Sequence, residues 1–469
     1  MDVAVAGAGP AGLFSAVALA RRGHRVTVVD RDGGPAADGS WERRGVMQFH
    51  HPHGFRPQIC AALEAEMPEV LDALTAAGAE LVVLPGGNGR PAGAAGLRCR
   101  RAVFERVLRR FAEQEPGVEL VRGHVDDVLR AGGRAAGLAV DGREQAAELV
   151  INASGRSARL AADLRAPAEG GDCGLSYVSR QYALLPGAEP GPMNAPVGVI
   201  QTLNGYLVAV FLQDSRTFSA LFMRPAGDKR FDVLRFAGAF EAAAQAVPAL
   251  AGWVTPDRSR PITPVLPGGR LHNTYRGQLD PEGAVGLPGL LHVGDTVCTT
   301  NPSAGRGIAV GLRQAVNLLH QIDEHPGDPE GAALAFDEWC TGNVRPWYED
   351  HVYWDADLLR RWDGGDVDVT RRLPSDLIME ATEADPSLWR VVGPYMAMEA
   401  LPGSLDEVEP QARAIFAAGW RAPAHPGPTR DELAALLADG HFEEARGNHA
   451  PPGAAATRPS STGRSGRPA

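Results

Sequence analysis

The hydrophobic pattern at the start of the chain predicts a strand, a tight turn, a helix and a second strand. Val3 and Val5 begin a short apolar strand, and residues 13–22 form an apolar run that ends at Gly23, a residue type that tolerates the conformation just after a helix. Residues 25–30 are rich in β-branched side chains and predict the second strand. Together these segments predict one βαβ unit of a parallel sheet.

Helix and strand patterns continue to alternate after this unit. Residues 101–113 place their apolar side chains on one helical face. Strand-like segments follow at 118–125 and 134–152, where the Asp141-Gly142 pair predicts a tight hairpin turn.

Residues 173–276 show a different pattern, in which apolar and polar positions alternate along several strands. The Asn204-Gly205 pair between two such strands predicts a hairpin, and residues 231–246 predict one helix. We expect this block to form a separate antiparallel sheet inserted into the parallel one.

The last third of the chain is mainly helical in pattern. An apolar run at 290–294 leads through a glycine-rich turn into a predicted helix at 306–322, and residues 331–440 are mostly helical. Residues 446–469 consist largely of Gly, Pro, Ser, Ala and Arg, which predicts a disordered tail.

Composition narrows the possible partners. The chain of 469 residues carries 46 basic and 57 acidic side chains, and its net charge of −11 disfavours nucleic acid and anionic membrane surfaces as partners. Its 5 cysteines lack CxxC spacing, which argues against a disulfide framework and a zinc site. The uncharged run at 190–213 contains prolines and a hairpin signal, and the start of the sequence lacks a basic signal-peptide segment. We therefore expect a soluble, cytoplasmic protein.

A glycine motif lies between the first strand and the first helix. Gly7, Gly9 and Gly12 have the spacing that allows a tight turn, a close approach of pyrophosphate to the backbone, and helix–strand packing. The start of the helix then presents free N–H groups to the phosphates. Asp30 ends the second strand, where a carboxylate can accept both ribose hydroxyls. The motif in this context predicts dinucleotide binding.

A second glycine-rich turn follows the apolar strand at 290–294. Gly294 and Asp295 precede an Asn-Pro-Ser-Ala-Gly-Arg-Gly-Ile segment at 301–308, which leads into a helix. Backbone amides and a helix dipole therefore converge on a second anionic group.

The order and spacing of these two motifs resemble the flavoprotein monooxygenases of the para-hydroxybenzoate hydroxylase fold, over roughly residues 1–325. The resemblance implies that FAD is the cofactor, with Gly7, Gly9, Gly12 and Asp30 at its ADP half and Asp295 at the ribityl chain. It also implies flavin or adenine contacts for a further set of residues: Arg44, Gln48, Arg101, Val125, Gly155, Gly294, Pro302, Gly305, Gly307 and Ile308.

One position departs from the family pattern. The family has an Asp-Gly pair in its middle motif, associated with FAD and NADPH binding, whereas this chain has Ser154 before Gly155. The chain also has no second GxGxxG unit for a nicotinamide nucleotide. Direct use of NADPH therefore does not follow from the sequence. We expect NAD(P)H as the electron donor, either directly or through a partner flavin reductase.

The sequence leaves the roles of two groups of residues open. His50, His51 and His53 are substrate-side candidates, but Pro52 and the lack of a nearby carboxylate or cysteine make them poor metal ligands. Loop packing is the alternative for these histidines. A set of tryptophans predicts helix packing or, less favoured, an apolar substrate mouth: Trp339, Trp347, Trp354 and Trp362. We assign no catalytic side chain and no metal site.

The resemblance implies an α/β fold in which an FAD-binding Rossmann-type domain is interleaved with an antiparallel substrate domain. The predicted parts are the FAD domain at 1–172 and 277–325, the substrate domain at 173–276, a helical region at 326–445 and the tail at 446–469.

The expected reaction is insertion of one oxygen atom from O₂, through a flavin C4a-hydroperoxide, by hydroxylation or epoxidation of a small, largely apolar metabolite of secondary metabolism. An O₂-independent reductase of the geranylgeranyl-reductase type is an alternative. A flavin-dependent halogenase is disfavoured, because the chain has the single lysine Lys229 and no Trp-x-Trp-x-Ile-Pro segment. A non-catalytic flavoprotein or binding module remains the third possibility.

Overall fold

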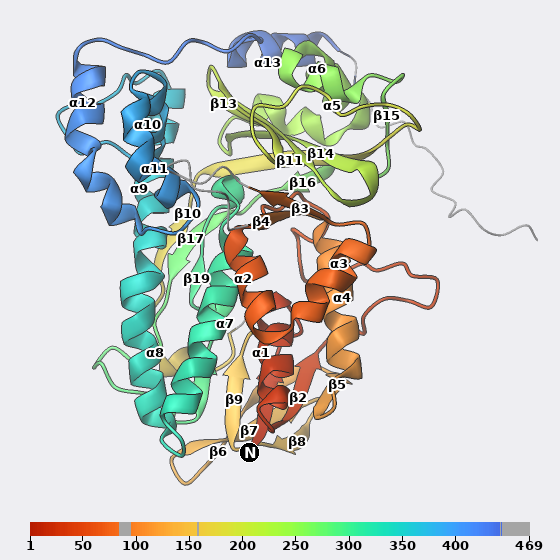
Figure 1. Cartoon of the computed structure of the whole chain (residues 1–469), viewed down its shortest axis with the longest axis vertical. Coiled ribbons are helices and arrows are strands. Elements are labelled where there is room, and N and C mark those ends of the chain that lie inside the picture. Colours follow the sequence, from red (N-terminus) through yellow and green to blue (C-terminus); the bar gives the residue numbers. More distant parts are fainter. Residues whose placement is uncertain (84–94, 157–158, 441, 443–469) are drawn as a thin grey trace, which may run out of the picture.

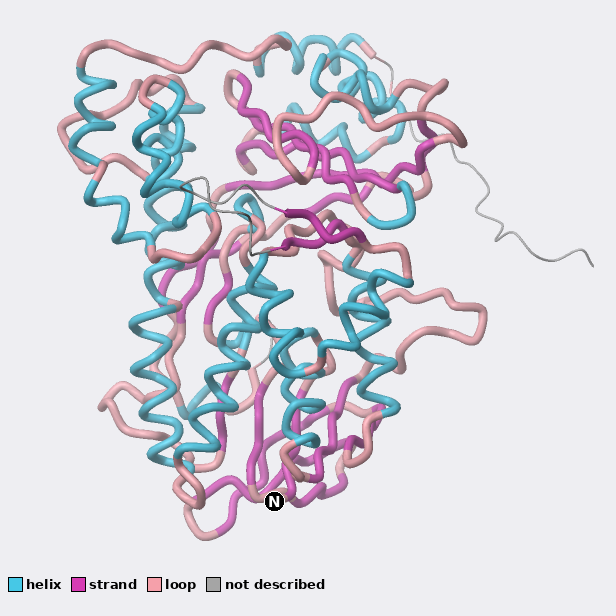
Figure 2. Tube along the Cα trace, in the orientation of Figure 1, coloured by secondary structure: helices cyan, strands magenta, loops and turns pink. Residues whose placement is uncertain are grey.

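A computed structural model of the chain describes residues 1–83, 95–156, 159–440 and 442. The molecule is elongated, with a parallel sheet and its helices in one half and an antiparallel sheet with a helical cluster in the other (Figures 1 and 2). The predicted tail at 446–469 lies outside the described residues. Within the described part, no helix is both long and apolar enough to cross a bilayer.

The parallel sheet has the strand order β18-β9-β1-β2-β5. Its strands are β1 (Asp2–Ala6), β2 (Arg25–Asp30), β5 (Val118–Arg122), β9 (Leu149–Asn152) and β18 (Leu290–His292). Side chains alternate between two faces, so that Val5 packs against the helices and its neighbour Ala4 packs on the other side. The helical face is covered by α1 (Pro10–Arg21), α4 (Arg101–Gln114) and α7 (Gly307–Glu324).

The opposite face of the parallel sheet is covered by a small antiparallel sheet: β6 (Val125–Ala131), β7 (Arg134–Val140) and β8 (Arg143–Ala146). Its last hairpin turns at Asp141 and Gly142, which both have positive φ, as the Asp-Gly pair predicted. The apolar pattern did not predict α2 (Pro57–Glu66), α3 (Pro68–Ala76) or the hairpin of β3 (Glu80–Val83) and β4 (Ala95–Arg98).

The larger antiparallel sheet has the order β12-β13-β14-β11-β15, and β16 also pairs with β11. The strands are β11 (Leu175–Leu184), β12 (Gly198–Leu203), β13 (Tyr206–Leu212), β14 (Thr217–Pro225), β15 (Ser259–Pro261) and β16 (Leu266–Gly268). The hairpin of β12 and β13 pairs Leu203 with Tyr206 around Asn204-Gly205, as predicted. One face packs on α5 (Ala237–Ala246), α6 (Pro248–Val254) and α13 (Arg430–Asp439).

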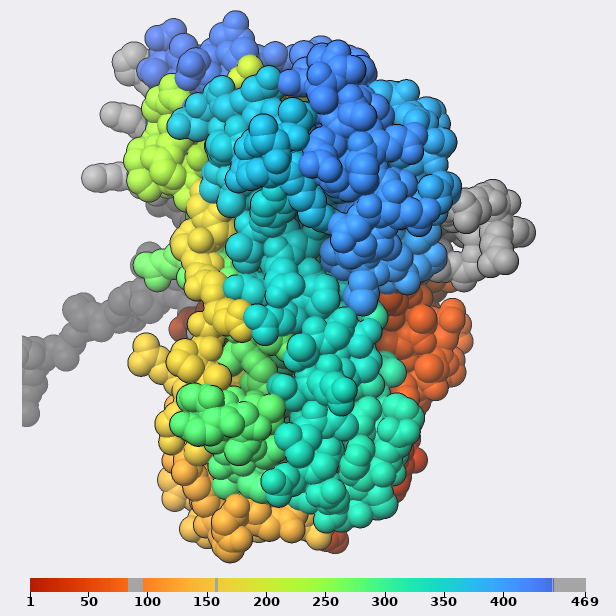
Figure 3. All heavy atoms as spheres, turned by 90° about the vertical axis from the view of Figure 1, so that its left-hand side faces the viewer, coloured from red at the N-terminus to blue at the C-terminus, as the bar shows by residue number. Residues whose placement is uncertain are grey.

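A narrow ribbon and a helical cluster complete the molecule. The ribbon consists of β10 (Glu169–Asp172), β17 (His272–Tyr275) and β19 (Cys298–Thr299). Beside it run α8 (Pro329–Asn343) and α9 (Arg345–Trp362), followed by α10 (Ser375–Glu380), α11 (Trp389–Met396) and α12 (Glu409–Ala417). Figure 3 shows these C-terminal helices covering one side of the molecule.

The predicted α/β architecture, with parallel and antiparallel sheets and a helical C-terminal region, is confirmed. Two details differ. The helix predicted at 231–246 is interrupted, because Phe236 is extended between the 3₁₀ helix η3 (Lys229–Arg235) and α5. Helix α13 packs on α5 and η3 rather than on the helices that precede it, since its apolar side chains join the core of the antiparallel sheet (Figure 1).

Candidate cofactor and substrate site

The first glycine loop (residues 7–12) forms the turn from β1 into α1. Gly7 has a φ of +108°, and a Cβ there would lie 2.5 Å from the Ala153 carbonyl oxygen. A Cβ on Gly12 would lie 2.0 Å from the Gly7 carbonyl oxygen. A Cβ on Gly9 would meet no described atom within 4 Å. The absence of a Cβ at Gly7 and Gly12 therefore allows backbone segments to pack closely, whereas Gly9 borders open space.

Asp30 lies at the end of β2, beside this loop. One oxygen of its carboxylate accepts a hydrogen bond from the Ala8 amide at 2.7 Å, and the other accepts one from the Asp32 amide at 2.8 Å. Arg43 donates to the same carboxylate at 3.0 Å. The side chain of Asp30 is only partly buried, so its remaining lone pairs can receive ribose hydroxyls.

Arg43 is a residue of this region that sequence reasoning missed. Its guanidinium is buried and forms ion pairs with both Asp30 and the fully buried Glu105, and it donates to the Ala8 carbonyl oxygen at 3.1 Å. Its neighbour Arg44, the predicted flavin-side residue, is exposed to solvent, and Gln48 is half-buried. Arg43 thus connects the first glycine loop to the start of α4.

The second glycine loop (residues 301–307) leads from β19 into α7. Gly305 has a φ of +61° and packs closely on Gly54, where its Cβ would lie 3.1 Å from the Gly54 Cα. Gly307 borders open space, and no side chain caps the start of α7. Pro302 lies in the 3₁₀ turn η5 (Pro302–Ala304), and Ile308 lies in the first turn of α7. The backbone N–H groups at the start of α7 are therefore available to an anionic ligand.

Asp295 follows Gly294 in the 3₁₀ turn η4 (Gly294–Thr296). Its side chain reaches the surface, but protein atoms surround its carboxyl closely, and this desolvation raises the pKa of the carboxyl. The cations Arg101 and Arg156 lie close enough to oppose that rise in pKa. Arg101 opens α4, forms an ion pair with Glu105 and donates to His53 Nε2 at 3.3 Å. Arg156 is a second residue that sequence reasoning missed.

Two further predicted cofactor residues follow the carboxyl ends of strands of the parallel sheet. Gly155, after β9, has a φ of +84°, and a Cβ there would meet no described atom within 4 Å. Val125, after β5, begins β6 and is half-buried. The contact of its backbone with adenine stays a prediction.

The three histidines point in different directions. His51 is buried, its Nδ1 lies 2.7 Å from Ser179 Oγ, and its ring stacks edge-on against Tyr177 at 4.6 Å. His53 faces Arg101, whereas His50 turns outward and its Nε2 lies 2.9 Å from Glu42. Burial lowers the pKa of His51 to about 4 and that of His53 to about 3, so both rings are neutral at neutral pH.

The low pKa of His51 predicts a pH-dependent contribution to stability. Since the unfolded chain binds a proton near the ordinary pKa of 6.5 and the folded chain only near 4, protonation favours unfolding as the pH falls through this window. His51→Asn removes that effect. As the pH falls from about 7.5 to about 5, we expect the wild type to lose on the order of 2 kcal/mol of unfolding free energy relative to the variant. Urea denaturation at the two pH values measures this change. A constant difference would show that His51 is not held neutral.

An apolar recess lies between the antiparallel sheet and the second glycine loop. It is shallow, with about 20 Å³ of room in this structure. Its lining contains no ionised side chain and consists of Pro52, Tyr177, Ile200, Leu207, Ala209, Phe211, Leu221, Met223, Pro302 and Ser303. Among the described residues, the buried Tyr177 hydroxyl and Ser303 Oγ have no hydrogen-bond partner. This lining therefore suits contact with an apolar molecule that carries a polar group.

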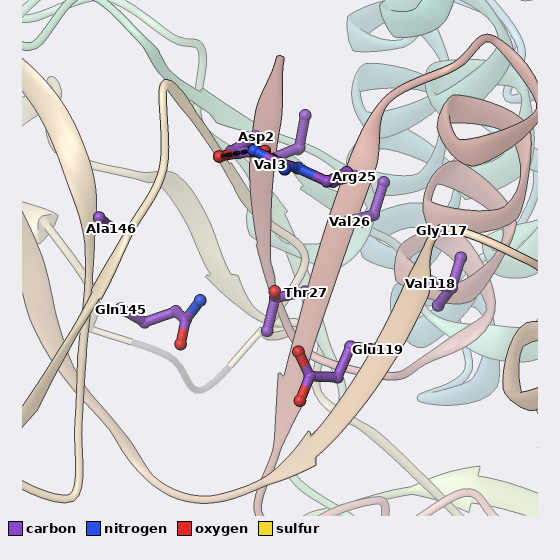
Figure 4. A pocket seen from close by; sticks show the side chains of 10 residues that line it. All are labelled: Asp2, Val3, Arg25, Val26, Thr27, Gly117, Val118, Glu119, Gln145 and Ala146. Carbon is purple, nitrogen blue, oxygen red and sulfur yellow. Dashed lines mark hydrogen bonds and ion pairs between the residues drawn. The ribbon is translucent and has the colours of Figure 1, made fainter.

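A second depression, of about 350 Å³, lies at the other end of the parallel sheet (Figure 4). Asp2, Arg25 and Val118, at the amino ends of their strands, line it together with Gln145. Ligands of open α/β sheets bind at the carboxyl ends of the strands, so this depression is not the cofactor site. Among the described residues, no cluster of three His, Cys, Asp or Glu side chains could hold a metal ion.

The residues at the two glycine loops fit FAD. The open spaces beside Gly9, Gly155 and Gly307 leave room for a ligand next to the backbone. The helices α1 and α7 both begin without a side-chain cap, so their N–H groups can receive the pyrophosphate and the negatively charged flavin edge. These features lie at the carboxyl ends of β1 and β18, the expected edge of the sheet.

Comparison with known families agrees with this geometry. Residues 2–87 match the family model described as FAD dependent oxidoreductase, and residues 91–170 match the one described as tryptophan halogenase. The first match, together with the fold, confirms the predicted enzyme class, an FAD-dependent oxidoreductase. A D-amino acid dehydrogenase of Sinorhizobium medicae (strain WSM419) is 35% identical over 97 residues, a match that covers 16% of this chain and only 23% of that protein.

Solved structures show the same fold over most of the chain. The flavin-dependent brominase Bmp2 has a TM-score of 0.65 at 14% identity, covering 90% of this chain and all of that one. PqsL, a probable FAD-dependent monooxygenase from Pseudomonas aeruginosa, has a TM-score of 0.58 at 17% identity, covering 78% and 98%. CabE, an aromatic hydroxylase from angucycline biosynthesis, also reaches 0.58, at 18% identity, covering 85% and 76%. The fold is thus shared by flavin enzymes that carry out different reactions.

Proposed function

We propose that this chain is an FAD-dependent monooxygenase that hydroxylates or epoxidises a small, largely apolar metabolite. The observation that carries the proposal is the apolar recess, which opens next to the second glycine loop and is roofed by the antiparallel sheet. A substrate in it would lie beside the flavin ring. The similar folds of PqsL and CabE support the same reaction class.

Bound FAD would supply the activation of O₂, and the protein residues would bind, orient and exclude water. Gly9 and the start of α1 would bind the pyrophosphate, and Asp295 the ribityl chain. The backbone amides at 305–308 would stabilise negative charge on the reduced flavin. The apolar side chains of β12, β13 and β14 would exclude water from the reacting oxygen.

The electron donor in this proposal is NAD(P)H, acting directly or through a separate flavin reductase. Ser154 replaces the aspartate of the family's Asp-Gly pair, which is associated with NADPH binding as well as FAD binding. This replacement supports the separate reductase. Ser154 Oγ donates to Asn152 Oδ1 on β9, so it is engaged within the protein.

Halogenation is the second candidate, since the tryptophan halogenase match and the brominase fold both favour it. The lysine that such chemistry needs has no counterpart at the recess. Lys229 is the only lysine of the chain, and it is exposed on η3 with its ammonium donating to the Ala226 carbonyl oxygen at 3.3 Å. Oxygen insertion is therefore the better supported reaction.

One experiment separates these reactions. The purified protein is loaded with FAD, reduced under nitrogen with dithionite, and mixed with ¹⁸O₂ in the presence of indole or styrene, with and without bromide. Product carrying one ¹⁸O atom supports the monooxygenase, and brominated product supports the halogenase. Reduction of the styrene double bond under nitrogen supports the reductase alternative. Failure to bind FAD in either redox state contradicts all three.

Filling the recess tests its role as substrate pocket. Leu207 on β13 lines the recess and is half-buried, so Leu207→Trp is expected to block the recess from its exposed side. We expect product formation from indole or styrene to fall at least about tenfold, because the substrate loses its position beside the flavin. The affinity for FAD, measured by fluorescence titration, should change less than about twofold. An unchanged rate of product formation would place the substrate elsewhere.

A further inference from the structure

The second glycine loop is attached at both ends to one helix of the C-terminal region. Asn301 begins the loop and contacts Asp355 of α9, and Arg306 near its end contacts Asp350 of the same helix. The two aspartates are five positions apart, a little more than one helical turn. Pro302 and Ser303, between these two contacts, also line the apolar recess.

Asp355 is a buried carboxylate without a cationic partner among the described residues. It is 2% exposed and accepts hydrogen bonds from the side-chain amides of Asn301 and Asn273, both at 2.6 Å. Burial raises the pKa of its carboxyl to about 6, despite these two donors. A buried charge of this kind is unfavourable for stability, so stability alone does not account for it.

Asn301 transmits this contact to the loop backbone. The side-chain nitrogen of Asn301 donates to Asp355, and its side-chain oxygen accepts from the backbone N–H of Ser303 at 2.6 Å. The backbone N–H of Asn301 donates to Asn273 Oδ1 at 2.7 Å. Asn301 is fully buried and is therefore held in one orientation. Asp355 therefore fixes the position of the first turn of the loop through Asn301.

Arg306 fixes the other end. Its guanidinium is 2% exposed, pairs with Asp350 at 2.9 Å and lies 4.5 Å from the ring centre of Trp347, also on α9. The hydroxyl of Tyr395 donates to Asp350 at 2.7 Å, so this carboxylate is itself held in place. These two anchors therefore hold the loop on both sides of residues 302–305, directly before the amides that would face the flavin.

We propose that Asp355 and Asp350 are positioning residues that act through Asn301 and Arg306 to hold the second glycine loop against the flavin ring. This proposal rests on the proposed binding of FAD at the two glycine loops and adds a role for the C-terminal helical region. The loop amides stabilise the reduced, negatively charged flavin more than the oxidised one. Loosening the loop therefore weakens the binding of reduced FAD more than that of oxidised FAD and lowers the reduction potential.

The test compares two variants that release the loop with different changes in charge. Asp355→Asn removes a negative charge, whereas Asn301→Leu keeps Asp355 and only removes the connection. We expect both variants to bind reduced FAD about tenfold more weakly relative to oxidised FAD, a shift of about 30 mV to more negative potential for a two-electron couple. A through-space charge effect would instead raise the potential in Asp355→Asn and leave it unchanged in Asn301→Leu. Potentials are measured by equilibration with redox dyes.

Asp357→Asn is the matched control on the same helix. Asp357 is also a buried aspartate, but it pairs with Arg360 and Arg361 and does not contact the loop. This variant should lower thermal stability without shifting the potential. An equal shift in Asp357→Asn, or an unshifted potential in both loop variants, would overturn the proposal.

If Asp355→Asn does not fold, Asp350→Asn applies the same test from the other end of the loop. Failure of the wild-type protein to bind FAD would instead contradict the proposed function and is seen before any variant is measured.

Discussion

Replacing Gly9 by valine is expected to abolish useful FAD binding while leaving the FAD-free protein folded. The backbone at Gly9 is extended, with φ −82° and ψ 178°, a conformation that valine adopts readily. The new side chain would enter open space in front of α1, where the pyrophosphate has to approach the backbone. We expect the FAD dissociation constant to rise at least about 100-fold, or about 3 kcal/mol, by fluorescence titration.

Two other glycines serve as controls for this experiment. Gly227 also borders open space but lies in the turn after β14, so Gly227→Val should leave FAD binding unchanged. Gly12→Ala should instead destabilise the FAD-free protein, because its Cβ would lie 2.0 Å from the Gly7 carbonyl oxygen. The FAD-free Gly9→Val protein should stay within about 1 kcal/mol of wild type. Normal FAD affinity in Gly9→Val would exclude the first glycine loop as the phosphate site.

The features that could be predicted from the sequence are those set by neighbouring residues. The turn glycines, the short apolar and β-branched runs of β1 and β2, and the Asn204-Gly205 hairpin each depend on a few consecutive positions. The failed prediction of an unbroken helix at 231–246 has a local cause as well. Phe236 is extended between two helical segments, and apolar periodicity alone does not mark such a break.

The contacts that sequence reasoning missed join segments far apart in the chain. Arg43 and Arg44 are adjacent and chemically identical, and only the position of α4 determines that Arg43 is the buried one. The link from Asn301 to Asp355 spans 54 residues, and no local pattern indicates it. Helix α13 lies close in sequence to other helices but packs on a different core, because the choice depends on shape and apolar area.

The ion-pair network around Arg43 gives the largest expected effect on stability. Glu105 is fully buried and paired with Arg43 and Arg101, and Asp30 is paired with Arg43. Arg43→Met keeps most of the apolar volume of the side chain but removes the cation that pairs with both carboxylates. Because breaking a buried ion pair leaves an uncompensated charge, we expect the free energy of unfolding to fall by about 3–5 kcal/mol. Urea denaturation followed by circular dichroism measures this loss.

The adjacent arginine is the matched control, since Arg44→Met removes the same charge from an exposed position and should change the unfolding free energy by less than about 0.5 kcal/mol. Adding Glu105→Gln to Arg43→Met neutralises the buried carboxylate and should recover part of the lost stability, as coupling between the two sites requires. Equal losses in Arg43→Met and Arg44→Met would contradict the buried network. Because Arg43 also orients Asp30 next to the first glycine loop, Arg43→Met should weaken FAD binding, and the double variant should not restore it.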